Sequence, residues 1–175
     1  QQWAQTFIPK NSITLFLVAS IPERRLTFEQ SKELVEYVLN RGFTPVLLGG
    51  KDVQKEGEGL VRAMKDERIK NCAGTTTFAQ SAALIQRSRL FIGSDSGLLH
   101  LACAVGIPVV GVFGPGNKAK WGPRGARHTT YSLDVECSPC TRFGYTLPTC
   151  HGSYHCMRTI KIKELWSAVE KNLSR

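Results

Sequence analysis

The 175-residue sequence has no long hydrophobic run, no initiator Met and neither of the common glycine-rich nucleotide fingerprints. No apolar stretch approaches the ~20 residues that a membrane-spanning helix needs. Neither GxGxxG nor the GxxxxGK(S/T) P-loop follows the first predicted strand, which argues against a nicotinamide-dependent enzyme and a P-loop ATPase. The first residues also lack the charged-then-apolar order of a signal peptide. We therefore expect a single globular domain, residues 1–175, cut from a longer protein.

Acidic residues are scarce relative to basic ones, with 14 Asp and Glu against 23 Lys and Arg and a net charge of +9. Such a balance suits phosphate-bearing ligands, an anionic membrane face or nucleic acid. The basic residues are scattered, however, and no arginine-rich arm or nucleic-acid-binding fingerprint is present. Anionic small molecules or lipids are therefore the favoured partners, and nucleic acid is not expected.

Residues 90–115 predict the fold most clearly. A short apolar run, LFIG, breaks at the polar turn SDSG of residues 94–97. An apolar helical segment follows over residues 98–105, and a second apolar run covers residues 109–113. Strand, polar turn, helix and strand make a βαβ unit, whose two strands pair in parallel.

The polar turn carries the chemistry of this unit. Ser94 or Asp95 can cap the helix, and free backbone N–H groups gather around Gly97 at the positive end of the helix dipole. Gly97 has no Cβ, so a phosphate can approach the backbone closely. His100 lies in the second helical turn, where it can point toward the same pocket. The alternative is an ordinary capped core helix with a hydrogen-bonded histidine.

Strands and helices alternate along the rest of the chain. The other predicted strands are residues 13–19, 44–48, 69–72 and an edge strand at 129–133, and the other predicted helices are residues 27–40, 53–65, one that Thr76 or Thr77 caps, and about 161–173. Phe28 and Phe78 count among the core-facing residues of their helices. This order predicts an α/β fold, a doubly wound, Rossmann-like parallel sheet of about five or six strands.

In such a sheet, the loops that follow the strands gather at one edge, where ligands bind. Here these loops are rich in Gly, Ser, Thr and basic residues. They cover residues 20–25, 49–52, 74–75, 94–100 and 114–118. We therefore expect a phosphorylated ligand at this edge.

Four of the six cysteines lie in one loop-rich segment, residues 134–158. They are Cys137, Cys140, Cys150 and Cys156. The first two form a CxxC pair, a common half of a zinc site, and the other two follow at a looser spacing. The pattern leaves three states open: a structural zinc that clamps the loop, a disulfide, or reduced thiols packed in the loop. Cys72 and Cys103 have apolar surroundings and are expected in the core.

Several of these motifs together resemble the C-terminal half of the heptosyltransferases, the GT-B glycosyltransferases of family 9 that build the lipopolysaccharide inner core. The matching series is Asp95-Ser96-Gly97-x-x-His100, Ala102, Gly106-x-Pro108, Phe113-Gly114 and Trp121-Gly122-Pro123. Ser20-x-Pro22-Glu23-Arg24-Arg25, the Ala73-Gly74-Thr75 turn and Cys156-Met157-x-x-Ile160 also fit. The likeness spans nearly all of the chain.

The resemblance implies a donor-binding domain for a nucleotide-activated sugar, typically ADP-heptose. By that likeness, Ser96 and Gly97 offer backbone N–H groups to the diphosphate, and His100 lies beside the phosphates. Asp95 bonds sugar hydroxyls or holds the turn. Arg24 replaces a lysine that the family usually has after the first strand, which keeps the charge but changes the hydrogen-bond geometry. Arg25, next to it, is expected to be a solvated surface charge.

The same resemblance implies two further donor contacts and one absence. Asp52 is the candidate for the nucleoside ribose, and Thr75 lies in the matching turn among the donor-binding residues. The acceptor and the catalytic base belong to an N-terminal domain that this sequence lacks, so no catalytic residue is assigned. We expect the chain alone to bind donor without efficient transfer.

The implied activity is inverting sugar transfer to a lipid-linked lipopolysaccharide core acceptor, with no cofactor required for the chemistry. The implied location is the cytoplasm, including a peripheral position on the inner face of the inner membrane. Two other readings stay open. One is a different GT-B enzyme, such as a UDP-sugar transferase or an epimerase, and the other is a non-catalytic nucleotide-sugar-binding or interaction module.

Overall fold

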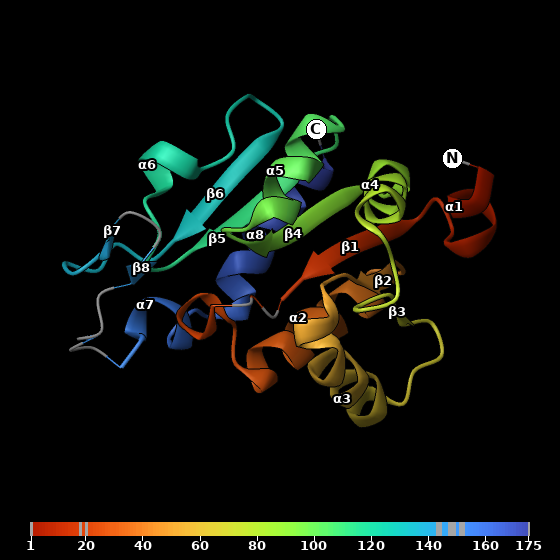
Figure 1. The fold of residues 1–175 in the computed structure, drawn as a ribbon, viewed down its shortest axis with the longest axis horizontal. Helices are drawn as coiled ribbons and strands as arrows, with labels where there is room; N and C mark the ends of the chain where they lie inside the picture. The colour runs from red at the N-terminus through yellow and green to blue at the C-terminus, as the bar shows by residue number, and fades with distance from the viewer. Residues whose placement is uncertain are drawn as a thin grey trace.

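Six parallel strands form the central sheet in the order β3-β2-β1-β4-β5-β6 (Figure 1). They are β1 (Ser12–Phe16), β2 (Thr44–Leu47), β3 (Lys70–Asn71), β4 (Leu90–Ser94), β5 (Val109–Phe113) and β6 (His128–Ser132). The computed structural model describes residues 2–17, 19, 21–142, 145–146, 150 and 153–174. Every neighbouring pair in this sheet is parallel, which confirms the doubly wound α/β sheet and its edge strand β6. A separate antiparallel hairpin joins β7 (Thr141–Arg142) to β8 (Tyr145–Thr146).

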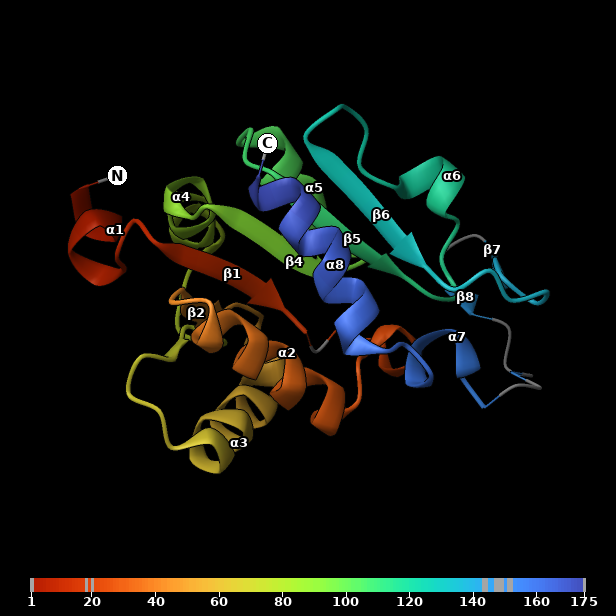
Figure 2. The same ribbon diagram turned by 180° about the vertical axis from the view of Figure 1, so that it is seen from behind.

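Helices cover both faces of the sheet (Figures 1 and 2). One face packs against α2 (Phe28–Asn40), α3 (Gln54–Met64) and α8 (Ile162–Leu173), and the other packs against α1 (Gln2–Phe7), α4 (Phe78–Arg87) and α5 (Gly97–Ala104). Strand side chains alternate between these two layers because successive residues of a strand point to opposite sides. In β4, Leu90 and Ile92 face the α2 and α8 layer, while Phe91 faces α4 and α5.

Two helices begin with the same sequence signature, Thr-x-x-Gln. At the start of α2, Thr27 Oγ1 accepts from Gln30 N–H at 3.2 Å, and the Gln30 side chain accepts from Thr27 N–H at 2.8 Å. Thr77 and Gln80 repeat this capping box at the start of α4, so Thr77 and not Thr76 is the cap. Each box satisfies two backbone donors that a helix start leaves open.

The two phenylalanines that follow these caps do not face the core, and that prediction was wrong. Phe28 is 47% exposed and Phe78 is 66% exposed. Each is the first residue of its helix, at the edge of the sheet where the preceding strands end. The first turn there extends past the strands, so an apolar side chain at that position has no sheet beneath it.

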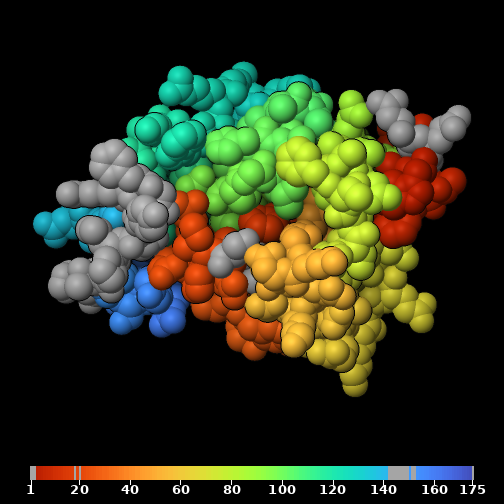
Figure 3. Space-filling model, in the orientation of Figure 1, coloured from red at the N-terminus to blue at the C-terminus, as the bar shows by residue number. Residues whose placement is uncertain are grey.

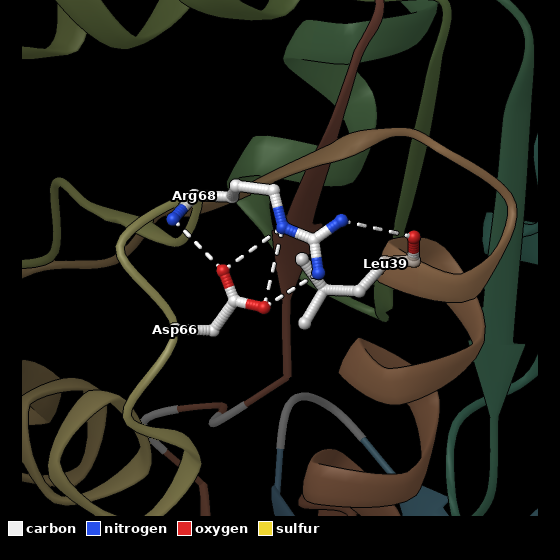
Figure 4. A network of polar contacts seen from close by, with 3 residues as sticks. All are labelled: Leu39, Asp66 and Arg68. Carbon is white, nitrogen blue, oxygen red and sulfur yellow. Dashed lines mark hydrogen bonds and ion pairs between the residues drawn. The ribbon is translucent and has the colours of Figure 1, made fainter.

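Some predicted boundaries also differ from the structure. The strand expected at residues 69–72 shortens to β3, and the helix expected at residues 53–65 is α3, which a 3-10 turn, η2 (Lys51–Val53), precedes. Between α3 and β3, the Arg68 guanidinium pairs with Asp66 and also donates to Leu39 O at the end of α2 (Figure 4). Asp66 and Arg68 thus connect the loop before β3 to the end of α2.

The C-terminal helix is confirmed as an amphipathic core helix. In α8, Ile162, Leu165, Trp166 and Val169 are buried in the same layer as α2. Gln30 of α2 joins this end of the chain, since its Nε2 also donates to Met157 O at 2.9 Å and Ile160 O at 2.8 Å. Across the described residues, none of the helices has the length and apolar character needed to cross a membrane.

Candidate functional site

The carboxyl ends of the strands lie at one edge of the sheet, and the arrowheads of β1, β4 and β6 point to the same side (Figure 1). The strand order runs outward from β1 to β3 in one direction and from β4 to β6 in the other. This reversal between the neighbours β1 and β4 opens a crevice, and ligands of doubly wound sheets bind in such a crevice. The loops after β1 and β4 therefore define the candidate site.

The helix after β4 begins with a capped but open turn. Ser96 is the cap, since its Oγ accepts from Leu99 N–H at 3.4 Å. The predicted caps, Ser94 and Asp95, were therefore wrong by two residues and one residue, respectively. Ser96 has extended backbone angles that suit a cap, whereas Ser94 still belongs to β4. α5 starts at Gly97, one residue before the helical segment that the sequence predicts at residues 98–105. Gly97 is exposed, and a Cβ placed on it would meet no atom within 4 Å, so a ligand has room to approach the first turn of the helix, where backbone N–H groups lack helical partners.

Asp95 and Arg24 join the loops on the two sides of the crevice. Arg24 lies at the end of a 3-10 turn, η1 (Pro22–Arg24), and its Nη1 is 3.1 Å from Asp95 Oδ2 and 3.2 Å from Asp95 O. The side chains are only 14% and 10% exposed, respectively. In the space-filling view, orange-red atoms of the segment after β1 lie directly against green atoms of the β4–α5 region (Figure 3). Arg24 Nε is also buried, with no hydrogen-bond partner among the described residues.

The loop after β5 closes the site from a third side. A Cβ on Gly116 would lie 2.5 Å from Asp95 Oδ2, so only glycine allows this loop to approach the carboxylate so closely. Burial raises the pKa of the Asp95 carboxyl above its ordinary value, while the charges of Arg24 and His100 lower it. Asp95 is thus a buried carboxylate held by cationic neighbours, and it fixes the turn from which α5 starts.

His100 and Trp121 meet beside this turn. His100 is exposed on α5, and its ring lies 6.0 Å from the Trp121 ring in an edge-to-face arrangement with an interplanar angle of 64°. Trp121 ends α6 (Lys118–Trp121), a short helix in the segment after β5, and is 48% exposed. The sequence contains this tryptophan within a matching motif, but nothing in the pattern predicts its contact with His100.

Arg25 is not the solvated surface charge that was expected. Its Nε donates to Ala19 O at 2.5 Å, and its Nη1 pairs with Glu56 Oε1 of α3 at 3.2 Å. Arg25 therefore joins two parts of the loop after β1 and also connects this loop to α3. The sequence gives no warning of this role, because the partner carboxylate lies 31 residues further along the chain.

The predicted donor residues fall into two groups along the same edge. Arg24, Asp95 and His100 come together with the Ser96-Gly97 turn, as described above. Asp52 is exposed in η2 after β2, and Thr75 is exposed after β3, where its Oγ1 donates to Cys72 O at 3.1 Å. The strand order places these two residues at the β2 and β3 end of the edge, away from Asp95. Their roles toward a nucleotide stay predictions.

Residues 138–141, within the cysteine segment of residues 137–156, contact the loop after β5. Cys140 N–H and Thr141 N–H both donate to Pro115 O, at 3.1 and 3.0 Å, and Ser138 Oγ donates to Gly114 O at 2.6 Å. All four cysteines of this segment are free thiols, and burial together with the other three thiols raises the pKa of Cys156 to about 11. Within the described ranges, no three His, Cys, Asp or Glu side chains are placed to hold one metal ion. The side-chain positions thus do not form a ligand set, and the structural zinc stays a prediction.

The two remaining cysteines were expected in the core. Cys72 is fully buried, as expected, and Cys103 on α5 is only partly covered.

Fold and site together define a class of protein, a Rossmann-like α/β domain that matches one half of GT-B heptosyltransferases in its six-stranded sheet order and topology. The model of glycosyltransferase family 9 (heptosyltransferase) matches residues 1–151. The chain belongs to this family.

Curated relatives share the family. Lipopolysaccharide heptosyltransferase 2 of Salmonella typhimurium is 31% identical over 97 residues, which cover 54% of this chain and 28% of that enzyme. Lipooligosaccharide heptosyltransferase 2 of Campylobacter jejuni is 26% identical over 150 residues, which cover 83% of this chain and 43% of that enzyme. The chain therefore spans less than half the length of these relatives.

Solved structures show the same fold. A family 9 glycosyltransferase from Veillonella parvula superposes with a TM-score of 0.83 at 23% identity, over 99% of this chain and 52% of that one. The E. coli ADP-heptose lps heptosyltransferase II gives a TM-score of 0.80 at 22% identity, over 99% of this chain and 50% of that one. The UDP-GlcNAc 2-epimerase of Methanocaldococcus jannaschii shares the fold less closely, with a TM-score of 0.62 at 13% identity.

Proposed function

We propose that this chain is the donor-binding half of a heptosyltransferase and that it binds ADP-heptose at the crevice between β1 and β4. The observation that carries the proposal is the start of α5, where Ser96 caps the helix, Gly97 is exposed with open space at its Cβ position, and the preceding residue Asp95 pairs with Arg24. A helix start combines free N–H donors with a positive dipole end, so it suits a diphosphate. Solved relatives support the choice of nucleotide, since one is an E. coli heptosyltransferase bound to ADP.

Each side chain of the site then has a task in this proposal. Arg24 supplies positive charge to the diphosphate, and its buried Nε is a donor that still lacks a partner among the described residues. His100 lies beside the phosphates on the exposed side of α5. Asp95 holds the turn through its ion pair with Arg24, while Asp52 and Thr75 receive the nucleoside from the β2 and β3 end of the edge.

The proposed chemistry is inverting transfer of heptose to a lipid-linked saccharide of the lipopolysaccharide core, at the cytoplasmic face of the inner membrane. The donor domain contributes by stabilising the negative charge that develops on the leaving ADP, through oriented N–H groups and cationic side chains. The acceptor and the catalytic base belong to the other half of the enzyme, and no metal or other cofactor is needed for the step.

A UDP-sugar enzyme is the second candidate, because the UDP-GlcNAc 2-epimerase shares the fold and is named for a UDP-sugar. Ligand binding stabilises a protein in proportion to the logarithm of ligand over Kd, so thermal shifts with ADP, AMP and UDP separate the candidates. We expect ADP to raise the melting temperature most, AMP to do so less because it lacks the second phosphate, and UDP to have a small effect. A preference for UDP would favour the second candidate, and no response to any of the three would overturn both.

A further inference from the structure

Trp121 is an exposed aromatic side chain at the rim of the proposed diphosphate site. Its indole is 48% exposed, and its ring lies 6.0 Å from that of His100. Large aromatic side chains are usually covered in folded proteins. Because Trp121 is exposed and contacts His100, its indole is accessible to a ligand bound at the start of α5.

Hydrogen bonds hold the backbone of α6, the helix that carries Trp121, in place. The Asn117 side chain caps α6 by accepting from Lys120 N–H at 3.0 Å, and Trp121 N–H donates to Asn117 O at 2.9 Å. Lys118 Nζ anchors the same helix to the end of β6, at 2.8 Å from Ser132 Oγ and 2.5 Å from Asp134 Oδ1. The indole is thus presented by a fixed element, as a rigid recognition surface requires.

The electrostatics of the ring suit a sugar. An indole face carries partial negative charge, and Lys120 Nζ already lies 5.0 Å from the Trp121 ring centroid as a cation would. The C–H groups of a sugar ring are weakly positive because each carbon bears an oxygen, so they pack on aromatic faces. In a nucleotide sugar the ring is bonded directly to the second phosphate, so it must lie next to the diphosphate site.

We infer that Trp121 is a specificity-determining residue that packs against the sugar ring of the nucleotide sugar and leaves the nucleotide to the other loops. The inference rests on the proposed function, because it takes the diphosphate to lie at the start of α5. It assigns the contact with His100 a purpose: His100 lies on the phosphate side of the indole, Lys120 lies over the ring, and the part of the indole that stays exposed faces the sugar.

The test compares binding of ADP and of ADP-heptose by calorimetry in the wild-type chain and in Trp121→Ala and Trp121→Phe. We expect Trp121→Ala to weaken ADP-heptose binding by at least fivefold and ADP binding by less than twofold. Trp121→Phe, which keeps an aromatic face, should restore most of the affinity for ADP-heptose. Trp3→Ala is the matched control, because Trp3 is also exposed, at 39%, but lies in α1 away from the carboxyl edge.

Three results would overturn the inference. Equal losses for ADP and ADP-heptose in Trp121→Ala would place the indole with the phosphates, and unchanged binding of both would remove it from the site. Wild-type protein that binds ADP-heptose no more tightly than ADP would show that no side chain holds the sugar. These results leave the proposed function standing, whereas wild-type protein that binds neither ligand overturns the proposed function as well.

Discussion

At Gly97, an added side chain should weaken ligand binding strongly and change the stability of the fold little. Its Cβ position is empty space, and its φ lies outside the left-handed region that favours glycine. We expect Gly97→Val to fold with unchanged stability while its isopropyl group covers the N–H groups of residues 97 and 98. The ADP affinity should fall at least tenfold, about 1.4 kcal/mol, measured by calorimetry beside a urea-unfolding curve.

Gly59→Val is the matched control for that prediction. Gly59 lies within α3, and a Cβ there also meets nothing within 4 Å, so the variant adds the same atoms far from the crevice. Its ADP affinity should equal that of the wild type. Wild-type affinity in Gly97→Val as well would remove the α5 start as the phosphate site.

Arg24 and Arg25 are adjacent in sequence but differ in what they hold. Arg24→Ala removes the partner of buried Asp95 and a cation of the diphosphate site, so we expect ADP binding to weaken by about 1.5–3 kcal/mol, the range for a charged hydrogen bond. Arg25→Ala removes the bonds to Ala19 O and Glu56. It should lower the free energy of unfolding by about 1 kcal/mol and change ADP affinity by less than threefold.

Calorimetry and urea unfolding of both variants check this pair of predictions. Arg25→Ala should change mainly the free energy of unfolding, whereas Arg24→Ala should weaken ADP binding and also lower the free energy of unfolding, because it leaves buried Asp95 without its cation. If Arg25→Ala loses ADP affinity and Arg24→Ala retains it, the assignment of the phosphate ligand within this loop is off by one residue. If neither variant changes ADP affinity, the loop after β1 does not contact the phosphates.

Cys72 links burial to a dependence of stability on pH. It is fully buried at the end of β3, and burial raises the pKa of its thiol from 9.0 to about 11. The unfolded chain therefore ionises this thiol before the folded chain does. The stability it contributes is fully present below pH 9 and is lost as the pH rises toward 11.

Relative to Cys72→Ala, we expect wild-type protein to lose about 2 kcal/mol of unfolding free energy between pH 8 and pH 10.5, given about 1.4 kcal/mol per pKa unit. Urea unfolding of both proteins across this range provides the measurement. Parallel curves for the two proteins would show that the folded thiol ionises as easily as the unfolded one.

At the scale of elements, the sequence predicts most of the fold because its local signals agree. The buried strands read as short apolar runs, and the Thr-x-x-Gln signatures mark the starts of α2 and α4. The turn at residues 94–97 breaks the run between a strand and a helix, so the βαβ unit and the crevice beside it follow from topology. A parallel sheet then places Arg24, Asp52, Thr75 and Asp95 on one edge without further information.

The rest depends on contacts between distant residues, which a single sequence does not reveal. The pattern gives Phe28 and Phe78 the apolar spacing of a core residue, yet both lie past the sheet edge. It gives no sign that Arg25 pairs with Glu56 or that Gly116 approaches Asp95. Ser96 rather than Asp95 caps α5 because Asp95 is committed to Arg24, and only the folded loops make that choice visible.

The cysteine segment is the element whose state the sequence and the side-chain positions leave to experiment. If the segment binds structural zinc, protein purified without added metal should contain one equivalent of zinc per chain, and its thiols should react only after a chelator is added. The segment donates two hydrogen bonds to Pro115 O, and the next residue, Gly116, lies close to the Asp95 carboxylate. If a zinc ion orders the segment, its removal should therefore also weaken ADP binding.

Metal analysis beside a free-thiol count tests this prediction, with Cys137→Ser expected to abolish zinc binding. Cys103→Ser is the control, since Cys103 lies in α5 outside the segment. Six reactive thiols without metal would contradict the clamp, and so would the loss of two thiols without metal, which would indicate a disulfide.

For the whole molecule, one edge of one sheet holds every residue assigned to the donor, and the chain spans about half of the solved heptosyltransferases that share its fold. The proposed function gives this edge the nucleotide sugar and gives the acceptor hydroxyl to the other half of the enzyme. The net charge of +9 favours anionic ligands throughout, which suits both the diphosphate and a phosphorylated lipid-linked acceptor.

We therefore expect this chain to bind ADP-heptose but to transfer no heptose to a lipid-linked core acceptor by itself. Inverting transfer needs a base that removes the proton of the acceptor hydroxyl as the sugar bond breaks, and the proposal places that base in the other half of the enzyme. Product formation is followed by mass spectrometry of the acceptor, with full-length E. coli heptosyltransferase II as the positive control under the same conditions. The chain should give no product above a sample without protein, although calorimetry on the same preparation shows donor binding. Steady turnover by the chain alone would mean that its carboxyl edge carries both acceptor and base, and the half-enzyme interpretation would then be wrong.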